Sequence, residues 1–392
     1  MKRVYVDYAA STPIRKEVMR AMAPYFAVKF GNASSLHSFG QEAITAVDKA
    51  RELVAHEIGA EFREVVFTGS ATEANNLALR GAVKQFKETF PSLRPRVIVS
   101  AVEHESVLHT ARDLEKEGVE VITIPVDAYG VVDVQKIKEA LNERVAIVSV
   151  MYVNNETGTI QPIASITSLM SHASAHPFPL FHTDAVQAFN YFSCNVKELG
   201  VNLMTLSGHK IGGPKGVGVL YVMQSGAKAR THCISPIQMG GGQEFGMRSG
   251  TENVPAIVGF TEAMRCASRE RKKEYARLIK CKRALWTHIK KCAPDAVIHG
   301  MDEARFKEAS PHILNVGFAR VPVDDLLVRL DMEGVAASSG SACASRAPEH
   351  SHVLMAMFQN ASRGIRFSFG KGTSTSDIAY VAKKIKVAVA RS

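Results

Sequence analysis

Lys210 stands in a segment, residues 206–221, that could make its amine reactive. The lysine follows a hydroxyl and an imidazole, Ser207 and His209, and it precedes a cluster of glycines between two apolar runs. In a tight, partly desolvated turn a lysine loses its proton more readily, and the neutral amine forms a Schiff base with an aldehyde. The alternative is a solvated turn lysine, and this segment considered alone favours that alternative.

A carboxylate upstream of Lys210 favours the reactive amine over the solvated turn lysine. Residues 181–187 predict a buried strand that ends in a carboxylate, Asp184, and an amide, Gln187. A pyridoxal cofactor needs a lysine for its aldehyde and a carboxylate for its ring nitrogen. Lys210 and Asp184 both stand where a strand passes into a turn, so the pair predicts a pyridoxal site.

Another strand end, at residues 67–76, combines features that suit a phosphate group. The chain passes through Gly69 and Ser70 into a predicted helix that begins near Thr72. The free N–H groups and the dipole at a helix start attract anions, and the Thr72 hydroxyl adds a donor. Simple capping of the helix by Ser70 or Thr72 is the alternative, and it is favoured if this segment is taken alone.

Two further strand ends bring an imidazole and an amide. His104 follows a strand expected at 97–101, and Asn155 follows one expected at 146–153. Open parallel sheets gather ligand groups at the carboxyl ends of their strands. His104 is suited to stack on a flat heteroaromatic ring, although an ordinary hydrogen-bonded loop histidine explains the segment equally well. Asn155 is suited to reach a ring hydroxyl, whereas Asn154 is expected to shape a turn.

Two residues of the last third are suited to act on a substrate. Cys343 lies in a small, polar stretch with a cationic neighbour, where an exposed thiol ionises and attacks readily. Cys266, Cys281 and Cys292 lie in helical patterns, which favours a packing role for each. Arg366 is of the type suited to bidentate capture of a substrate carboxylate. A surface salt bridge is the alternative for this arginine, and its segment alone slightly favours it.

Composition limits the class of protein. The 392 residues are 46% hydrophobic and 22% charged, and a chain of this length buries a large core. The basic residues behind the formal charge of +10 are scattered, which favours solvated helix faces over a nucleic-acid surface. The sequence has no membrane-length apolar run, no signal-peptide pattern at its start and no CxxC pair. We therefore expect a protein of the reducing cytoplasm, with no membrane contact and no metal site.

Short β-branched runs alternate with amphipathic helical patterns through the first two-thirds of the chain. This alternation predicts an α/β fold with a doubly wound, mostly parallel sheet covered on both faces. Strands are expected at 65–68, 97–101, 119–125, 146–153, 179–183, 203–207 and 217–222, and helices at 38–58, 72–89, 106–117 and 134–141.

The pattern changes near residue 253. A long charged and apolar helix is expected from 255 to 292, followed by shorter elements of both kinds up to residue 390. We therefore predict a large α/β domain over 15–255. A smaller α+β domain is expected to combine 1–14 with 256–392.

Taken together, these segments resemble a cysteine desulfurase of the class V aminotransferase branch of fold type I pyridoxal-phosphate enzymes. The resemblance begins at residues 6–13, continues through 31–37 and the strand ends above, and reaches residues 365–368. Several motifs in the same order make it specific. It implies the fold type I transferase architecture, pyridoxal 5′-phosphate as cofactor and a homodimer.

The resemblance also implies cofactor contacts. Lys210 is similar to the lysine that bonds to the cofactor aldehyde, and Asp184 to the carboxylate that pairs with the ring nitrogen. His104 is similar to the imidazole that stacks on the ring and takes part in catalysis, and Gln187 to the amide near the ring oxygen. Asn155 is similar to the asparagine that touches cofactor and substrate. The phosphate is expected to contact Ala71, Thr72, Ser207, His209 and, from the other subunit, Thr251.

For the substrate, the resemblance implies that Arg366 holds the carboxylate of L-cysteine and that Cys343 attacks its sulfur. Alanine then leaves, and a persulfide remains on the enzyme for an acceptor. The long stretch between Cys343 and Arg366 is similar to that of the mobile-loop group of desulfurases. That group implies transfer to protein acceptors for iron–sulfur cluster assembly or tRNA thiolation.

The sequence departs from the usual pattern at Met239, where a histidine is frequent, and at Phe245, where an arginine is frequent. Both departures concern a partner surface rather than the reacting groups. Three other functions stay open at this point: a selenocysteine lyase, another class V aminotransferase, and a binding module without catalysis.

Overall fold

A seven-stranded sheet forms the centre of the protein in a computed structural model that describes residues 2–171, 178–225, 231–319, 321–340, 351–358 and 364–390. Only β8 runs antiparallel to both of its neighbours, and the other adjacent pairs are parallel. The predicted mostly parallel α/β fold is confirmed. In spatial order the strands are β2 (Val65–Thr68), β8 (Gly218–Val222), β7 (Leu203–Ser207), β6 (Leu180–Asp184), β5 (Val145–Ser149), β3 (Arg96–Ser100) and β4 (Glu120–Ile124).

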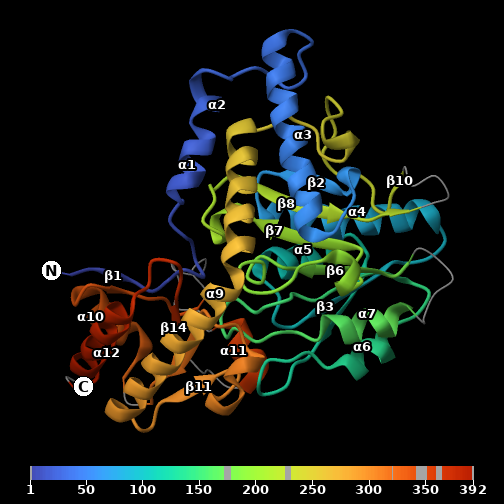
Figure 1. Ribbon diagram of the computed structural model, residues 1–392. Helices are drawn as coiled ribbons and strands as arrows, with labels where there is room; N and C mark the ends of the chain where they lie inside the picture. Colours follow the sequence, from blue (N-terminus) through green and yellow to red (C-terminus); the bar gives the residue numbers. More distant parts are fainter. Residues whose placement is uncertain are drawn as a thin grey trace.

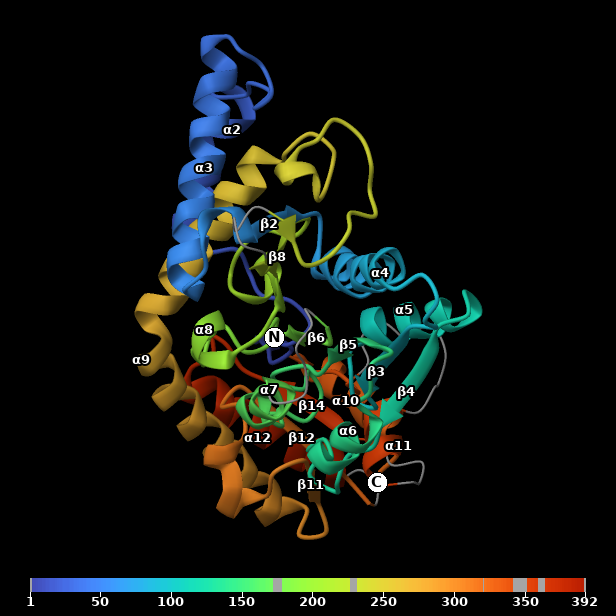
Figure 2. The ribbon, with the colours of Figure 1, turned by 90° about the vertical axis from the view of Figure 1, so that its right-hand side faces the viewer.

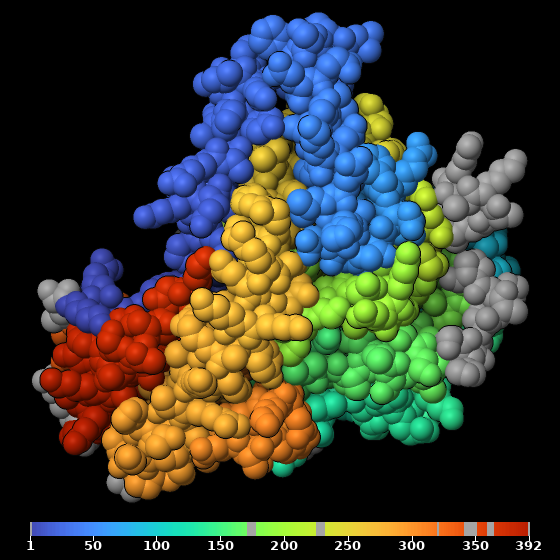
Figure 3. Space-filling view, viewed as in Figure 1, coloured from blue at the N-terminus to red at the C-terminus, as the bar shows by residue number. Residues whose placement is uncertain are grey.

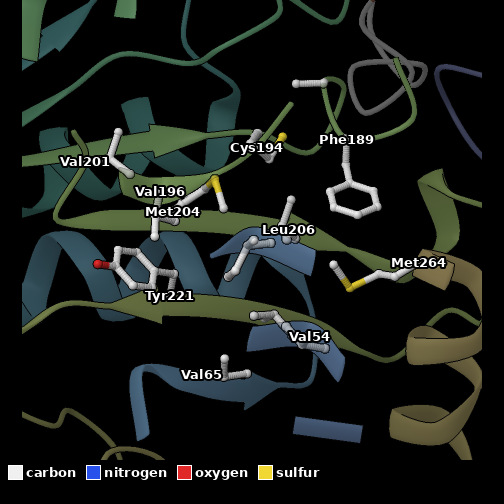
Figure 4. Close-up of a cluster of buried hydrophobic side chains, with 14 of the residues drawn as sticks. Val54, Val65, Phe189, Cys194, Val196, Val201, Met204, Leu206, Tyr221 and Met264 are labelled. Atoms are coloured by element: carbon white, nitrogen blue, oxygen red, sulfur yellow. The ribbon is translucent and has the colours of Figure 1, made fainter. Parts of the chain in front are cut away.

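Helices cover both faces of this sheet (Figures 1 and 2). On one face α3 (Ser38–Ile58) and α9 (Val254–Cys292) pack together, and on the other α4 (Ala71–Thr89) packs on α5 (Glu105–Lys116). Each strand contributes apolar side chains to the packing on both faces of the sheet, because successive side chains point to opposite faces. Figure 4 shows the core on the first of these faces, in which Val65, Met204 and Tyr221 meet residues of α3 and α9.

The strands match the expected ranges closely, except for β5. A strand was expected over 146–153, but β5 ends at Ser149. The chain beyond it still donates the backbone N–H of Val150 to the carbonyl of His182 and that of Tyr152 to the carbonyl of Asp184. The apolar run therefore stays bonded to β6 while it leaves the regular register, because it bends toward the turn that Asn154 forms.

Besides the large core that packs on the seven-stranded sheet, the protein has a separate small core beside it. The antiparallel strands β11 (Val297–His299), β12 (Ile313–Gly317) and β14 (Ile365–Ser368) form its sheet, and α10 (Val323–Met332) and α12 (Thr375–Ala390) pack with it. Helix α9 contributes its first half to the large core and its second half, from Leu278, to the small core. The division at residues 14/15 and 255/256 stays a prediction, because this one rigid element belongs to both cores.

The remaining elements are short connections and edge pieces. At the N-terminus, β1 pairs in parallel with β13. Within the described ranges, none of the helices is both long and apolar enough to cross a bilayer. These elements are β1 (Val4–Tyr5), α1 (Lys16–Met22), α2 (Pro24–Ala27), α6 (Val134–Ala140), α7 (Ile163–Ser171), α8 (Val196–Leu199), β9 (Gln224–Ser225), β10 (Thr231–His232), β13 (Val335–Ala336) and α11 (His352–Phe358), with the 3-10 turns η1 (Phe62–Glu64), η2 (Gly208–Lys210), η3 (Glu244–Gly246) and η4 (Glu303–Glu308).

Gly218 explains how two distant strand ends come together. It lies in register with Thr68 of β2 on one side and with Ser207 of β7 on the other. A Cβ added at Gly218 would lie 2.6 Å from the carbonyl carbon of Ser70. The missing side chain therefore lets the turn before α4 approach the end of β7, which brings two predicted phosphate-binding segments side by side.

Phe260 of α9 supports the turn that bears Lys210, so its removal tests this packing. The side chain is fully buried, and a Cβ added at Gly208 would lie 3.2 Å from its Cδ2. We expect Phe260→Ala to lower the free energy of unfolding by about 3–5 kcal/mol, the usual effect of removing a buried aromatic ring. Guanidinium denaturation measures the change. Lys273→Ala, an exposed position of the same helix, is the control and should stay within about 0.5 kcal/mol. Equal midpoints for the two variants would contradict the packing.

Candidate active site

A cavity of about 500 Å³ opens at the carboxyl ends of the central strands. The N-terminal segment 9–11 forms part of its wall, and Gly340, His352 and Arg366 reach it from the last part of the chain. Ten of the residues predicted from sequence line this one cavity: Ala71, Thr72, His104, Asn155, Asp184, Gln187, Ser207, His209, Lys210 and Arg366.

Lys210 ends the turn η2 directly after β7, as the sequence predicted. Its Nζ donates to the carbonyl oxygens of Ala9 at 2.6 Å and Ala10 at 2.9 Å. The Thr12 side chain fixes the turn itself, because its Oγ1 donates to the carbonyl of His209 at 2.7 Å and accepts from the N–H of Gly212 at 2.8 Å. The amine is therefore held inside the cavity wall rather than solvated on a free turn.

Asp184 ends β6 and is 6% exposed. One carboxylate oxygen accepts from the backbone N–H of Val186 at 3.0 Å, and the other accepts from Nδ2 of Asn75 at 2.9 Å. Asn75, on α4, also donates to the hydroxyl of Ser106 at 2.8 Å. Asn75 was not among the site residues predicted from the sequence. The only available signal was its position one helical turn after the predicted phosphate site.

His104 caps the N-terminus of α5 and also lines the cavity. Its Nδ1 accepts from the backbone N–H of Ser106 at 3.1 Å and lies 2.8 Å from the hydroxyl of that serine. Since Nδ1 accepts the backbone N–H and so carries no proton, it is the serine hydroxyl that donates to Nδ1. Burial is the main cause that lowers the pKa of His104, and Asp184 opposes this effect. Asp184, Asn75, Ser106 and His104 thus form one hydrogen-bonded series along the floor of the cavity.

The structure corrects the surface alternative for Arg366. The side chain is 2% exposed and pairs with Asp7, whose Oδ1 lies 2.9 Å from one terminal nitrogen. The other terminal nitrogen donates to the carbonyl oxygens of Asn155 at 2.9 Å and Gly340 at 2.8 Å. Within the part of the chain that the structure describes, Arg366 Nε is buried and has no hydrogen-bond partner. Asp7 was not predicted as a site residue, because 359 residues separate it from Arg366.

In the predicted phosphate segment, residues 67–76, the helix start is capped by a side chain and also faces the cavity. Ser70 does cap α4, since its Oγ accepts from the N–H of Glu73 at 3.1 Å. The same helix start nevertheless faces the cavity, beside Ser207 and His209. Burial, together with the charges of Lys210 and Lys215, lowers the pKa of His209 to about 4, so this imidazole is neutral at pH 7. Lys215 also lines the cavity and was not among the predicted contacts.

Glu156 is a further cavity residue that was not among the predicted site residues. It is 1% exposed, and its Oε2 accepts from the hydroxyl of Ser351 at 2.6 Å. Burial is the main cause that raises the pKa of this carboxyl. The hydrogen bond from Ser351 to this carboxyl joins the start of the segment after residue 350 to the loop that follows β5.

Two further residues predicted from the sequence remain, Thr251 and Cys343. Thr251 is exposed and does not line the cavity. Cys343 lies outside the described residues. The nearest described cavity residues on either side of it, Gly340 and His352, both line the cavity.

Comparison with known proteins identifies the family of this chain and its relatives. A profile of the aminotransferase class-V family matches residues 4–381. The cysteine desulfurase IscS of Dictyoglomus turgidum is 42% identical over 384 residues, covering 97% of this chain and 93% of that protein. The cysteine desulfurase of Homo sapiens is 38% identical over 388 residues, covering 98% and 81%.

Solved structures agree with these relatives. A NifS-like protein superimposes with a TM-score of 0.89 at 33% identity and covers all of both chains. SspA in complex with cysteine gives a TM-score of 0.76 at 33% identity over 94% of this chain and 99% of that one. Enzymes of this kind are generally dependent on pyridoxal phosphate. The chain therefore belongs to the class V aminotransferase family, and the relatives that it matches over its whole length are cysteine desulfurases.

Proposed function

We propose that this protein is a cysteine desulfurase that converts L-cysteine to L-alanine and keeps the sulfur as a persulfide on Cys343. The observation that carries the proposal is the meeting of an amine, a carboxylate and an imidazole, from Lys210, Asp184 and His104, in one cavity. These groups come from three different strand ends. Such a set suits pyridoxal phosphate, which when bound supplies an aldehyde and a ring that accepts electrons from the substrate.

The hydrogen bonding of Asp184 fits the ring nitrogen of this cofactor. Each carboxylate oxygen accepts one protein hydrogen bond, and each retains a lone pair for a further donor. The carboxylate is thus fixed in place and still able to accept from a protonated ring nitrogen. His104 is held by its Nδ1 alone through Ser106, which leaves the face of its ring for stacking.

The cofactor phosphate is assigned to the start of α4. Its backbone N–H groups, the Thr72 hydroxyl and Ser207 offer donors, and the helix dipole favours an anion there. His209 is neutral and can donate one hydrogen bond, while Lys215 adds a positive charge. Thr251 is proposed to complete this group from a second subunit.

Arg366 is proposed to hold the substrate carboxylate, with Asn155 beside it. Asp7 and two carbonyl oxygens fix the guanidinium on one side. Arg366 lines the cavity, and a guanidinium captures a carboxylate through its N–H groups. Binding at this position directs the rest of L-cysteine toward Lys210.

Cys343 is proposed as the nucleophile. The carbon–sulfur bond of the substrate breaks, a sulfur–sulfur bond forms on the Cys343 thiolate, and the former Cβ gains a proton to give alanine. The balance of this transfer needs no external oxidant. The thiol must be reduced before each turnover, which suits the reducing cytoplasm. The sulfur then passes to acceptor proteins for iron–sulfur cluster assembly or tRNA thiolation.

Replacement of Cys343 tests the sulfur transfer. We expect Cys343→Ser to keep the visible absorbance of bound pyridoxal phosphate and to lose sulfide release from L-cysteine by at least about a thousandfold, since a hydroxyl is a far weaker nucleophile. Lys210→Ala, the control for the cofactor, should lose the absorbance itself. Sulfide released at the wild-type rate by Cys343→Ser would contradict the persulfide. Comparison of L-cysteine with L-selenocysteine separates a desulfurase from a selenocysteine lyase.

Replacement of Asp184 tests the ring-nitrogen contact. In Asp184→Ala the Nδ2 of Asn75 and the N–H of Val186 lose their acceptor, and the ring nitrogen loses its negative partner. We expect cofactor that is still bound to support turnover at least about a hundredfold more slowly, because the neutral ring withdraws electrons poorly. A single-turnover assay of the loaded variant measures this. Normal turnover in a fully loaded preparation would contradict the role of Asp184.

A homodimer is proposed because this chain leaves Thr251 outside its own cavity and exposes a group of apolar side chains. The group lies on the projection formed by α1, α2 and the start of α3, in blue at the top of Figure 3. Its members include Met19, Phe26, Val28, Phe30, Leu36 and Phe39, at 59%, 65%, 70%, 64%, 91% and 50% exposed. Apolar surface of this kind marks an interface, and a second copy is the occupant that also supplies Thr251.

Sedimentation velocity tests the dimer. We expect the wild type to sediment as a dimer and the double variant Phe30→Asp with Leu36→Asp to sediment as a monomer, because charges would be buried unpaired in the interface. Val328→Asp, which replaces an apolar side chain of α10 that is 59% exposed, is the matched control and should remain dimeric. A dimeric double variant would show that this projection is not the interface.

A further inference from the structure

Both ends of the Gln187 amide are engaged, and this fixes its orientation. The Nε2 atom donates to the carbonyl oxygen of Ala9 at 3.0 Å, and Oε1 lies 3.0 Å from Nε2 of His312. The Ala9 carbonyl can only accept, and it also receives the Lys210 amine at 2.6 Å. The nitrogen of the amide must therefore face Ala9, and its oxygen must face the histidine.

This orientation determines the protons of His312. Because Gln187 Oε1 is an acceptor, the imidazole must donate to it through Nε2. In a neutral ring Nδ1 is then the acceptor, and the hydroxyl of Ser310 lies 2.5 Å from it and donates. The three hydrogen bonds therefore all point the same way: Ser310 donates to His312, His312 donates to Gln187, and Gln187 donates to the Ala9 carbonyl.

The surroundings of His312 keep the ring neutral and in place. The residue is 3% exposed, and its ring stacks on that of Tyr191, with centroids 4.5 Å apart. Burial is the main cause that lowers its pKa well below the ordinary value, and the charges that act on it are all cationic: Lys282, Arg366 and Lys210. Both the burial and the neighbouring positive charges therefore disfavour a ring that is protonated at both nitrogens.

We infer that His312 is a positioning residue that holds Gln187 as a hydrogen-bond donor toward the cofactor. One N–H of the amide is taken by Ala9, and the second belongs to a side chain that lines the cavity. With Oε1 held by His312, the amide cannot turn its oxygen toward the cavity. The group presented there is a donor, which stabilises an anionic ring oxygen and disfavours a neutral one. The inference rests on the proposed pyridoxal-phosphate site.

The pH dependence of the visible absorbance of bound cofactor tests this role without any turnover. A donor at the ring oxygen stabilises the form with more negative charge, so its loss should move the midpoint upward. We expect His312→Ala and Gln187→Ala each to raise the midpoint by about one pH unit, a tenfold change and the usual effect of one such hydrogen bond. The double variant should show no further shift, because His312 acts only through Gln187.

Two further variants make the comparison specific. His312→Gln restores an N–H near the position of Nε2 and should return the midpoint toward the wild-type value, which also covers the case in which His312→Ala fails to fold. His299→Gln is the matched control. This histidine is equally buried, at 3%, and its Nδ1 is bonded to Asn315, which does not line the cavity. Its midpoint should equal that of the wild type.

The outcomes separate this inference from the proposed function. A visible band in the wild type with an unshifted midpoint in His312→Ala overturns the role of His312 and leaves the cofactor site intact. Equal, additive shifts in the wild-type and Gln187→Ala backgrounds also overturn it, since His312 would then act independently. A wild-type protein that develops no visible band with pyridoxal phosphate overturns the proposed function and this inference together.

Discussion

The candidate site depends on one short segment, residues 7–12, which crosses between the two cores. Asp7 pairs with Arg366 of the small sheet, and the Ala9 carbonyl accepts from both Lys210 and Gln187 of the large one. Thr12 then bonds on both sides of the lysine turn. Backbone carbonyls cannot ionise or rotate away, so they are a rigid reference for the amine. Displacement of this segment would release the nucleophilic amine, the amide and the arginine at the same time.

The second constraint is the cost of leaving polar groups unpaired when they are buried. Asp184, Asn75, Ser106 and His104 are linked in a single hydrogen-bonded series, in which each side chain has one orientation. Sites built in this way are preorganised, because the hydrogen bonds exist before a ligand arrives. Two buried atoms of the site have no hydrogen-bond partner among the described residues, Oδ1 of Asn75 and Nε of Arg366.

Much of this arrangement could be predicted from the sequence, because strand ends are local signals. Apolar runs followed by Asp184, His104 or Lys210 indicated both the strands and the side chains that line the cavity. Asp7, Asn75 and His312 could not be found in this way. His312 meets Gln187 across 125 residues, and Asp7 meets Arg366 across 359, so only the packed fold brings them together. The domain boundary predicted at 255 falls within a helix that contributes to both cores, and it stays a prediction.

The central claim is that the Lys210 amine, held by the N-terminal carbonyls, bonds covalently to the aldehyde of pyridoxal phosphate. Borohydride reduction of the cofactor-loaded protein makes that bond permanent, and peptide mass spectrometry then locates it. The account predicts the pyridoxyl group on the peptide that contains Lys210 and on no other. Attachment at a different lysine, such as the neighbouring Lys215, or no attachment at all, would contradict it.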